Sequence, residues 1–217
     1  MNDKPSPQLA PSSPGADSTD TDLGIVVVDD VLPLDEQQKI HRFLLDGPWS
    51  YGWRSNNEDA AQKFWHRHFA GSVNDPETGG NAHPQRIADC SGELMNTAPL
   101  VHSFWQRLQK KIFQDHVLSR CYANALPYGV EGGTHADSPI PGDCTAVYYP
   151  HETWHSDWGG ETLVFNQDCS DILTAVYPKP NRLFIFPGFV NHVARGVSKS
   201  CPHVRITLMF KTTRKRP

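Results

Sequence analysis

Short apolar runs alternate with turn residues through the second half of the chain. They are rich in β-branched and aromatic residues and are bounded by Gly, Pro, Asn or Asp; they span 121–129, 144–150, 161–165, 172–178, 182–188 and 204–211. Runs of this length and composition are typical of antiparallel strands. We therefore expect a mostly β-structure over this region, either a sandwich or a barrel.

The first half of the chain contains two segments with helical periodicity. In the first, 34–47, the apolar side chains Ile40, Phe43 and Leu44 fall on one face of a helix. Gly47 follows them and is a suitable C-terminal stop. The pattern predicts a short helix with one buried face.

The second helix is expected over 97–117, with Thr97 as its cap and Pro99 in its first turn. Its apolar stripe has i, i+4 spacing and consists of Leu100, Phe104, Leu108 and Ile112, with Val101 and Trp105 beside it. A strand over 23–32 precedes both helices, and 48–96 shows little periodicity. We expect the helices to pack on the outside of the sheet.

Composition indicates one domain preceded by a polar segment. Residues 1–22 contain four Pro, four Ser and four Asp, which predicts a disordered leader, and residues 23–217 are expected to form a single domain. The net charge of −4 gives no general attraction to nucleic acid or to anionic membranes. The N-terminus has no apolar signal region, and the longest aliphatic run, 25–28, is too short to span a membrane. We expect a cytoplasmic protein without a nucleic-acid or membrane partner.

Cysteine usage supports the same compartment. The five cysteines are odd in number and form no CxxC pair. Neither a disulfide framework nor a thiolate zinc site is therefore expected. Buried free thiols in a reducing compartment are the simpler interpretation.

The stretch "EGGTHADS", 131–138, carries the most specific chemical signal. His135 and Asp137 are two residues apart, so on extended backbone both side chains point the same way. Two histidines and one carboxylate suit a mononuclear non-haem Fe(II) site with open coordination positions. His192, which follows the apolar run 182–188, is the best candidate for the third ligand. A lone HxD pair also occurs by chance in solvated turns, so a second signal is needed.

The last apolar run supplies that second signal. Arg205, Thr207 and Met209 share one face of the expected strand. The opposite face carries Val204, Ile206, Leu208 and Phe210. If helices cover the apolar face, Arg205 points into the barrel, where a guanidinium and a nearby hydroxyl can bind a carboxylate. A structural Arg–Asp pair and an edge residue facing solvent are the alternatives.

In this order the segments resemble the double-stranded β-helix core of prolyl-4-hydroxylase-type oxygenases that depend on Fe(II) and 2-oxoglutarate. The resemblance covers 120–211 and rests on "THAD", "CTAVYYP", "WGGETLVF", "NRLFIFPGFVNHVARGV" and "VRITLMF". It implies a cupin-like jelly roll with flanking helices. His192 and Arg205 are thirteen positions apart, a few more than is usual in the family, and the loop "GVSKSCPH" accounts for the difference.

The resemblance also implies a site and a reaction. His135, Asp137 and His192 would ligate the iron. The residues expected to contact 2-oxoglutarate are Arg205, Thr207, Tyr149, Asn124 and Tyr122. O2 completes the set of reactants, and ascorbate is a further candidate cofactor. The reaction would hydroxylate an unactivated C–H bond and release succinate and CO2, and the carboxylate of Asp137 favours hydroxylation over halogenation.

Three other pairs of possible metal ligands, each with at least one histidine, compete with this assignment. His155 and Asp157 form a second HxD pair, but they lie in a turn-like segment outside the family's order. His151 and His155 are four apart, yet the glycines that follow argue against a helical zinc pair. His66 and His68 have no carboxylate nearby in the sequence, so we expect them to be structural or to face the substrate.

The substrate is the least constrained part of the interpretation. The residues that could bind a polar or anionic substrate are Arg54, Trp65, His66, Arg67 and Trp154. Packing roles fit these residues equally well. A small polar metabolite, such as an amino acid or natural-product intermediate, is favoured because no peptide-docking module is evident. A protein or peptide residue is the alternative substrate. A non-catalytic cupin-like metal- or ligand-binding protein is the alternative from another class, and nucleic-acid demethylation ranks lowest because the last basic position of 204–211 is Lys211.

Overall fold

The computed structural model describes residues 23–55, 62–72 and 89–215. The predicted leader, 1–22, lies outside these residues. Within them, ten strands and three α-helices follow one another, so β-structure dominates as the sequence predicts. Each of the six apolar runs after residue 120 overlaps a strand.

Seven strands form one large antiparallel sheet in the order β1-β8-β5-β10-β4-β3-β2. Their bounds are Val26–Val28 (β1), Arg182–Pro187 (β8), Cys144–Tyr149 (β5), Arg205–Arg214 (β10), His116–Leu126 (β4), Phe64–Gly71 (β3) and Ser50–Trp53 (β2). The last long strand, β10, pairs with both β4 and β5. Its side chains therefore occupy the centre of the sheet.

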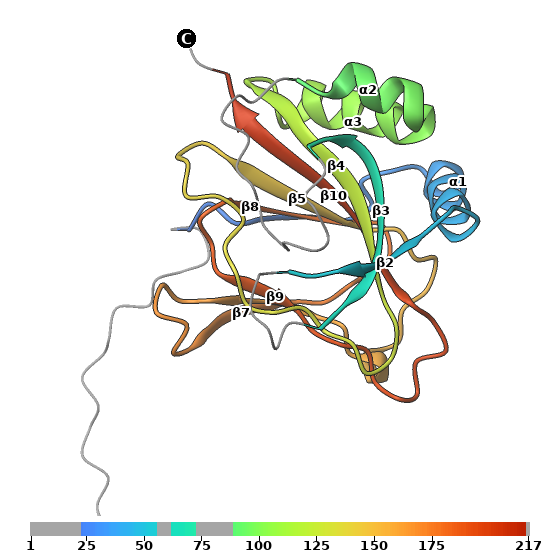
Figure 1. Cartoon of the computed structure of the whole chain (residues 1–217), viewed down its shortest axis with the longest axis vertical. Helices are drawn as coiled ribbons and strands as arrows, with labels where there is room; N and C mark the ends of the chain where they lie inside the picture. Colours follow the sequence, from blue (N-terminus) through green and yellow to red (C-terminus); the bar gives the residue numbers. More distant parts are fainter. Residues whose placement is uncertain (1–22, 56–61, 73–88, 216–217) are drawn as a thin grey trace, which may run out of the picture.

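A second, smaller sheet faces the first. It contains β7 (Ile172–Val176), β6 (Thr162–Phe165) and β9 (His192–Ala194), in that order. Figure 1 shows β7 and β9 on the side of the large sheet opposite to the helices. Two facing antiparallel sheets of this kind make the double-stranded β-helix, so the predicted fold is confirmed.

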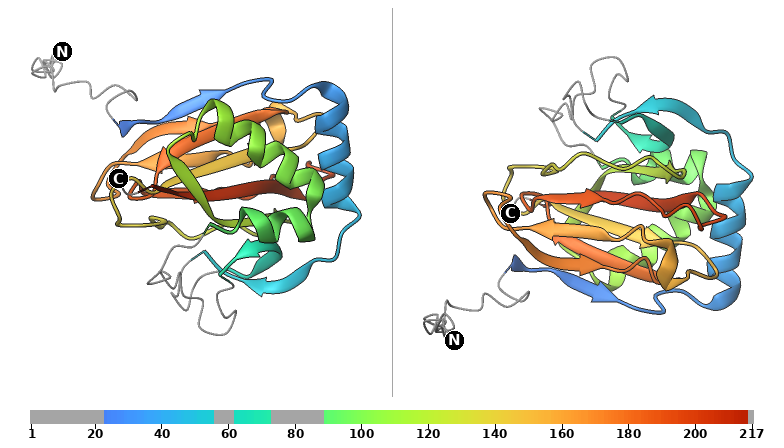
Figure 2. Two further views of the ribbon diagram at one scale, coloured as in Figure 1. Left: turned by 90° about the horizontal axis from the view of Figure 1, so that it is seen from above. Right: turned by 90° about the horizontal axis from the view of Figure 1, so that it is seen from below.

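Three helices cover the outer face of the large sheet: α1 (Leu34–Leu45), α2 (Ser91–Thr97) and α3 (Pro99–Lys111). In Figures 1 and 2, α2 and α3 lie over this face and α1 lies at its end. The core between the layers is apolar; among its buried members are Ile40, Leu44, Val101, Phe104, Trp105, Leu108, Ile206, Leu208 and Phe210. The expectation that the helices pack outside the sheet is confirmed.

The inner face of the large sheet has a different composition. A second cluster of buried residues fills the space between the sheets: Tyr122, Val147, Tyr149, Val164, Val176, Phe184, Phe186, Val190 and Met209. Arg205 and Thr207 alternate with the outer-face residues of β10 and are buried too. As predicted from the period of two, the arginine points away from the helices and into the barrel.

Some expected boundaries and contacts are wrong. Thr97 does not cap α3; it ends α2, and its hydroxyl donates to the carbonyl oxygens of Phe69 and Glu93. The second helix stops at Lys111, which leaves Ile112 40% exposed at the end of the stripe. The helix α2 and the strands β2 and β3 lie in the region where the sequence shows no clear period.

The remaining expectations concern the thiols and the membrane. All five cysteines are free, and three of them are buried, whereas Cys169 is exposed. Among the described residues, no helix is long and apolar enough to cross a membrane.

Candidate metal centre and its pocket

The structure brings the three predicted ligands together. The ligand atoms of His135, Asp137 and His192 all lie within 4.8 Å of one another. The amide of His135 donates to the carbonyl of His192 at 3.1 Å, and the amide of His192 donates back at 2.9 Å. The amide of Asp137 donates to the carbonyl of Gly188 at 2.8 Å, just after β8. These bonds tie the HxD segment to the β8–β9 connection.

Both imidazoles present the same nitrogen to the centre of this cluster. Nδ1 of His135 lies 2.8 Å from the carbonyl oxygen of Gly133, and Nδ1 of His192 lies 3.0 Å from that of Val190. Because a carbonyl oxygen can only accept, each Nδ1 carries the proton. In the neutral form of each ring, Nε2 then has a free lone pair, which is the tautomer that a metal ligand needs.

Asp137 is held as a carboxylate. Its side chain is 6% exposed, and its Oδ2 accepts a hydrogen bond from Thr145 Oγ1 at 2.6 Å and forms an ion pair with Lys211 Nζ. Burial alone would raise the pKa of Asp137, but Lys211, His192 and His135 hold it well below its ordinary value. The other oxygen, Oδ1, faces Nε2 of His135 at 3.4 Å. Oδ2, which Thr145 and Lys211 hold, also lies 3.7 Å from Nε2 of His192, so both oxygens face the cluster.

The protonation state of His192 also suits a metal. Burial lowers the pKa of His192 to about 4, although the nearby Asp137 opposes the shift. The imidazole is neutral at neutral pH and can donate its lone pair. Two imidazoles and one carboxylate on one side of a cavity form a donor set that fits Fe(II) and leaves further positions open.

A buried arginine lies at the other end of the barrel interior. Arg205 is 1% exposed; its Nε donates to the Gly160 carbonyl at 2.6 Å, and its Nη2 donates to Thr162 Oγ1 at 2.9 Å. The Tyr149 hydroxyl bonds the same Thr162 oxygen at 2.8 Å. No carboxylate among the described residues forms an ion pair with Arg205. An uncompensated buried cation is costly, so this end is suited to receive an anionic group.

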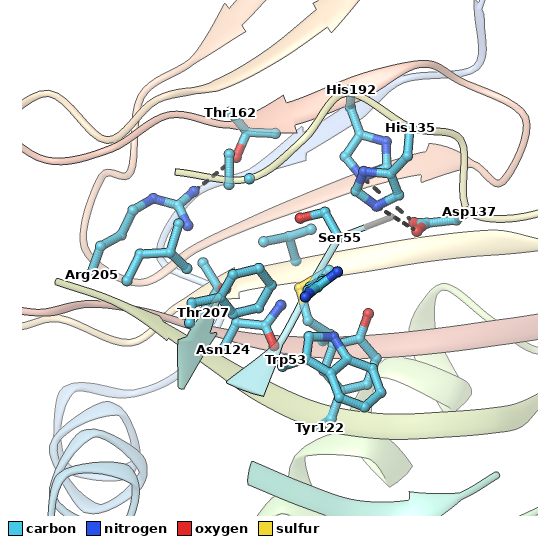
Figure 3. A pocket seen from close by; sticks show the side chains of 17 residues that line it. Trp53, Ser55, Tyr122, Asn124, His135, Asp137, Thr162, His192, Arg205 and Thr207 are labelled. Carbon is cyan, nitrogen blue, oxygen red and sulfur yellow. Dashed lines mark hydrogen bonds and ion pairs between the residues drawn. The ribbon is translucent and has the colours of Figure 1, made fainter. Parts of the chain in front are cut away.

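One pocket joins the two ends (Figure 3). It contains about 620 Å³ of space outside the protein atoms, part of it open to solvent. Arg205 and Thr162 lie at one end, and His135, Asp137 and His192 lie at the other. Between and beside them the lining includes Trp53, Arg54, Ser55, Tyr122, Asn124 and Thr207.

Comparison with protein families agrees with this geometry. The family model described as "2OG-Fe(II) oxygenase superfamily" matches residues 122–211, a stretch that contains all three candidate ligands and Arg205. Residues 122–211, which carry the site, belong to the 2OG-Fe(II) oxygenase superfamily. This oxygenase is therefore an oxidoreductase, and its family implies Fe(II) and 2-oxoglutarate as its metal and co-substrate. A search of curated proteins found no match to the chain.

Solved structures share the fold of this oxygenase at low identity. A 2OG-Fe(II) oxygenase-family oxidoreductase from Burkholderia pseudomallei has a TM-score of 0.63 and 15% identity, over 89% of this chain and 87% of that one. A prolyl hydroxylase from Trichoplax adhaerens, in complex with a hypoxia inducible factor peptide fragment, has a TM-score of 0.56 and 16% identity, over 89% of this chain and 85% of that one. A prolyl-4-hydroxylase from Pseudomonas putida has a TM-score of 0.54 and 16% identity, over 91% of this chain and 95% of that one.

The predicted contacts to 2-oxoglutarate divide into two groups. Thr207, Asn124 and Tyr122 line the pocket of this oxygenase together with Arg205. Tyr149 does not line it. Its ring lies 5.6 Å from the guanidinium carbon of Arg205, behind the Thr162 hydroxyl, so it is placed to support the arginine.

The predicted substrate residues also divide. Arg54 lines the pocket. His66 lies one layer behind it, stacked on Trp53 with ring centroids 4.0 Å apart and bonded to Asn124 at 3.0 Å. Trp154 packs with the 196–203 loop and donates to the Gly159 carbonyl at 2.9 Å.

Trp65 and Arg67 lie on the opposite face of β3. Trp65 is 40% exposed beside Tyr51. Arg67 donates to the Phe43 carbonyl at 2.7 Å, and its guanidinium carbon lies 4.2 Å from the Phe43 ring. On a strand, alternate residues point to opposite faces, and these two face α1 and solvent rather than the barrel. We therefore leave both out of the proposed substrate pocket.

Several residues that shape the site were not predicted from the sequence. Thr145 and Lys211 hold Asp137, Thr162 holds Arg205, and Trp53 lines the pocket from β2. Lys211 was recoverable, because it follows Arg205, Thr207 and Met209 at intervals of two. The others depend on strand pairing that one sequence does not reveal.

Proposed function

We propose that this oxygenase hydroxylates an unactivated C–H bond of a small polar molecule, with His135, Asp137 and His192 as iron ligands and Arg205 as the anchor of 2-oxoglutarate. The observation that carries the proposal is one pocket with a His–Asp–His cluster at one end and, at the other, a buried arginine that forms no ion pair with any described residue. A dicarboxylate can bridge these two ends, with one carboxylate at each.

Fe(II) with 2-oxoglutarate would supply the oxidising power for the reaction, with release of succinate and CO2. The protein's own residues bind and orient the reactants. Arg205 and Thr207 would bind the distal carboxylate of 2-oxoglutarate, while Thr162 and Tyr149 keep the guanidinium in place. The buried setting of Asp137 and Arg205 excludes water and strengthens their electrostatic interactions.

The lining of the pocket supports a small substrate. Apolar and aromatic side chains such as Trp53, Tyr122 and Met209 surround a few convergent polar groups, as is common at sites for small molecules. A residue of a protein or peptide is the second candidate. It is motivated by the Trichoplax prolyl hydroxylase, which binds a peptide fragment, although its 16% identity carries over the fold alone.

Succinate formation tests the proposal. Protein loaded anaerobically with Fe(II) and 2-oxoglutarate is exposed to O2 with single amino acids, other small polar acids and amides, or proline-containing peptides. We expect at least one small molecule to raise succinate formation above the rate without substrate, and His135→Ala to abolish it. If only peptides raise the rate, the small-molecule assignment is wrong. If wild-type protein forms neither an Fe(II)–2-oxoglutarate absorption band nor succinate, the proposed roles of the site are wrong.

A further inference from the structure

A second arginine faces the barrel interior, at a distance from Arg205. Arg120 lies on β4, on the same face as the pocket residues Tyr122 and Asn124. Its guanidinium carbon is 4.6 Å from the centroid of the Tyr122 ring and 4.9 Å from that of the Trp53 ring, so the group is packed against both. Its Nε and Nη2 are enclosed and have no hydrogen-bond partner. No carboxylate among the described residues forms an ion pair with it.

The neighbour of Arg120 across the sheet is a second cation, which increases the electrostatic cost of burying Arg120. Lys211 on β10 is its register partner, so two cations stand directly opposite each other on the inner face. Like charges in this position destabilise a sheet unless counter-charges separate them. Lys211 forms an ion pair with Asp137, whereas Arg120 forms none with any described residue. Burial lowers the pKa of Arg120, and the charge of Asp137 opposes this shift only from a distance.

Arg120 is too far from Arg205 to share its ligand. On β4, Arg205 is opposite Leu126, and Arg120 is six positions further along the same strand. At about 3.3 Å per residue, the two positions are ~20 Å apart. A small dicarboxylate that binds Arg205 at one end cannot also reach Arg120. One small dicarboxylate therefore cannot serve both arginines, and Arg120 lies at the level of Lys211, the ion-pair partner of Asp137.

The charge balance of the site points the same way. The charges of Fe(II) and of 2-oxoglutarate cancel. Among the described residues around the pocket, the cations Arg205, Lys211 and Arg120 then outnumber the carboxylates of Asp137 and Glu161, and Glu161 acts on Arg205 only from a distance. The loaded site keeps an excess of positive charge, and a negatively charged substrate would reduce it.

We infer that Arg120 forms an anion-binding subsite for the substrate of this oxygenase, which holds a carboxylate of the substrate beside the rings of Trp53 and Tyr122. The inference rests on the proposed function and narrows it: the small polar substrate is a carboxylic acid. A planar guanidinium pairs well with a planar carboxylate, and the rings on its flanks fix its orientation.

Binding of matched acid and amide probes tests the subsite without turnover. Anaerobic protein loaded with Fe(II) and 2-oxoglutarate is titrated at constant ionic strength with pairs such as phenylacetate and phenylacetamide, or proline and prolinamide. We expect at least one acid to bind about tenfold or more tightly than its amide, as befits a charged hydrogen-bond partner. Arg120→Met should remove this preference, and Arg120→Lys should keep part of it. If no acid in the panel is preferred over its amide, the inference is wrong.

Two further arginines serve as controls. Arg67 is also half-buried over aromatic rings, those of Phe43 and Phe69, but it faces the helices, so Arg67→Met should keep the preference for acids. Arg54 lines the pocket and has an enclosed Nε without a partner, which makes it the rival anion site. If Arg54→Met loses the preference and Arg120→Met retains it, the subsite belongs to Arg54 and the inference is overturned.

The failure of this inference can be told apart from failure of the proposed function. The absorption band of the Fe(II)–2-oxoglutarate complex and its 2-oxoglutarate affinity are measured first in each variant. An unchanged band in Arg120→Met shows that the loaded site forms, so a retained acid preference counts against Arg120 alone. Absence of the band in wild-type protein counts against the iron and co-substrate roles instead.

Discussion

Two segments of this oxygenase share the pattern His-x-Asp and differ in what surrounds it. His135 lies 3.4 Å from Asp137, and His155 lies 3.5 Å from Asp157, so each pair is in contact. The side chains of the first pair are 19% and 6% exposed, whereas those of the second are 62% and 79% exposed. Spacing and even contact are thus the same, and burial separates the two.

The difference arises from other parts of the chain. In the first pair, His135 exchanges backbone hydrogen bonds with His192, and Asp137 is bound by Thr145 and Lys211. These three partners come from three different strands. In the second pair, Nδ1 of His155 accepts from the amide of Asp157 at 3.3 Å, so a local turn occupies one of the ligand nitrogens. Among the described residues, only the first pair has a third ligand within reach. A metal site here is a property of strand register more than of a motif.

The largest expected effect follows from this comparison. His135→Ala or His192→Ala removes one of three ligands and should abolish both Fe(II) binding and turnover. His155→Ala should keep the iron, because its imidazole is exposed and far along the chain from the other ligands. The measurement is an anaerobic Fe(II) titration with 2-oxoglutarate that follows the absorption band of the complex. A variant His155→Ala without the band, next to a His135→Ala that retains it, would reverse the comparison.

Two arginines show the same kind of contrast, because one has an ion-pair partner in the protein and the other does not. Arg182 is paired with Asp29 at 2.7 Å, whereas Arg205 is buried and has no ion-pair partner in the part of the chain that the structure describes. Arg205→Ala should raise the KM for 2-oxoglutarate by on the order of a hundredfold to a thousandfold, since losing one partner of a buried charge pair costs roughly 3–5 kcal/mol. Arg205→Lys should recover part of the loss, and Arg182→Ala should leave this KM unchanged. Steady-state kinetics at saturating substrate decide it; an unchanged KM in Arg205→Ala would remove the arginine from the co-substrate site.

A smaller effect, on Fe(II) affinity, is expected when the Thr145 hydroxyl that binds Asp137 is removed. Thr145→Val keeps the shape of the side chain and removes the hydrogen bond to Asp137 Oδ2. Such outer contacts typically contribute about ten- to a hundredfold to metal affinity. Fe(II) affinity should fall within this range, and Thr145→Ser should restore it. An affinity equal to that of the wild type would mean that Lys211 alone positions the carboxylate.

How much of this the sequence predicts depends on the range of the interaction. Period-two runs fix the strands and their faces, which is why β10 was assigned correctly down to the inward direction of Arg205. Ligands that stand two apart, or directly after a strong strand, were found for the same reason. These signals are local, and each is complete within a few residues.

What was missed depends on pairing between distant segments. In β3, Trp, His and Arg follow one another without a clean alternation of apolar and polar residues, because the strand buries His66 on one face and packs Arg67 against Phe43 on the other. Arg67 and His66 are neighbours in sequence yet lie on opposite faces, one against α1 and one behind the pocket. Thr145 meets Asp137 only because the chain turns back after the HxD segment and β5 runs beside it. None of these contacts has a signature in one sequence.

The smallest expected effect concerns pH and a third histidine of the same region. His151 is 4% exposed, and its Nε2 accepts a hydrogen bond from the Ile206 amide at 2.9 Å, next to Arg205. Burial, followed by His41 and Arg205, lowers the pKa of His151 from 6.5 to about 3. The unfolded chain therefore takes up a proton as the pH falls through about 6.5, whereas the folded chain resists it until about pH 3. The stability that the neutral imidazole contributes is complete above about pH 6.5 and is lost progressively below it.

His155, four residues on, is exposed and accepts only from its own turn, so it serves as the control. His151→Gln keeps an acceptor for the Ile206 amide but cannot be protonated. It should destabilise the fold near pH 7, and its deficit relative to the wild type should shrink towards about pH 5, where the wild type has lost part of the histidine contribution. His155→Gln should run parallel to the wild type over the same interval. Urea denaturation at several pH values measures both slopes. If His151→Gln also runs parallel, the buried histidine does not stay neutral in the fold, and burial alone does not separate the histidines of this segment.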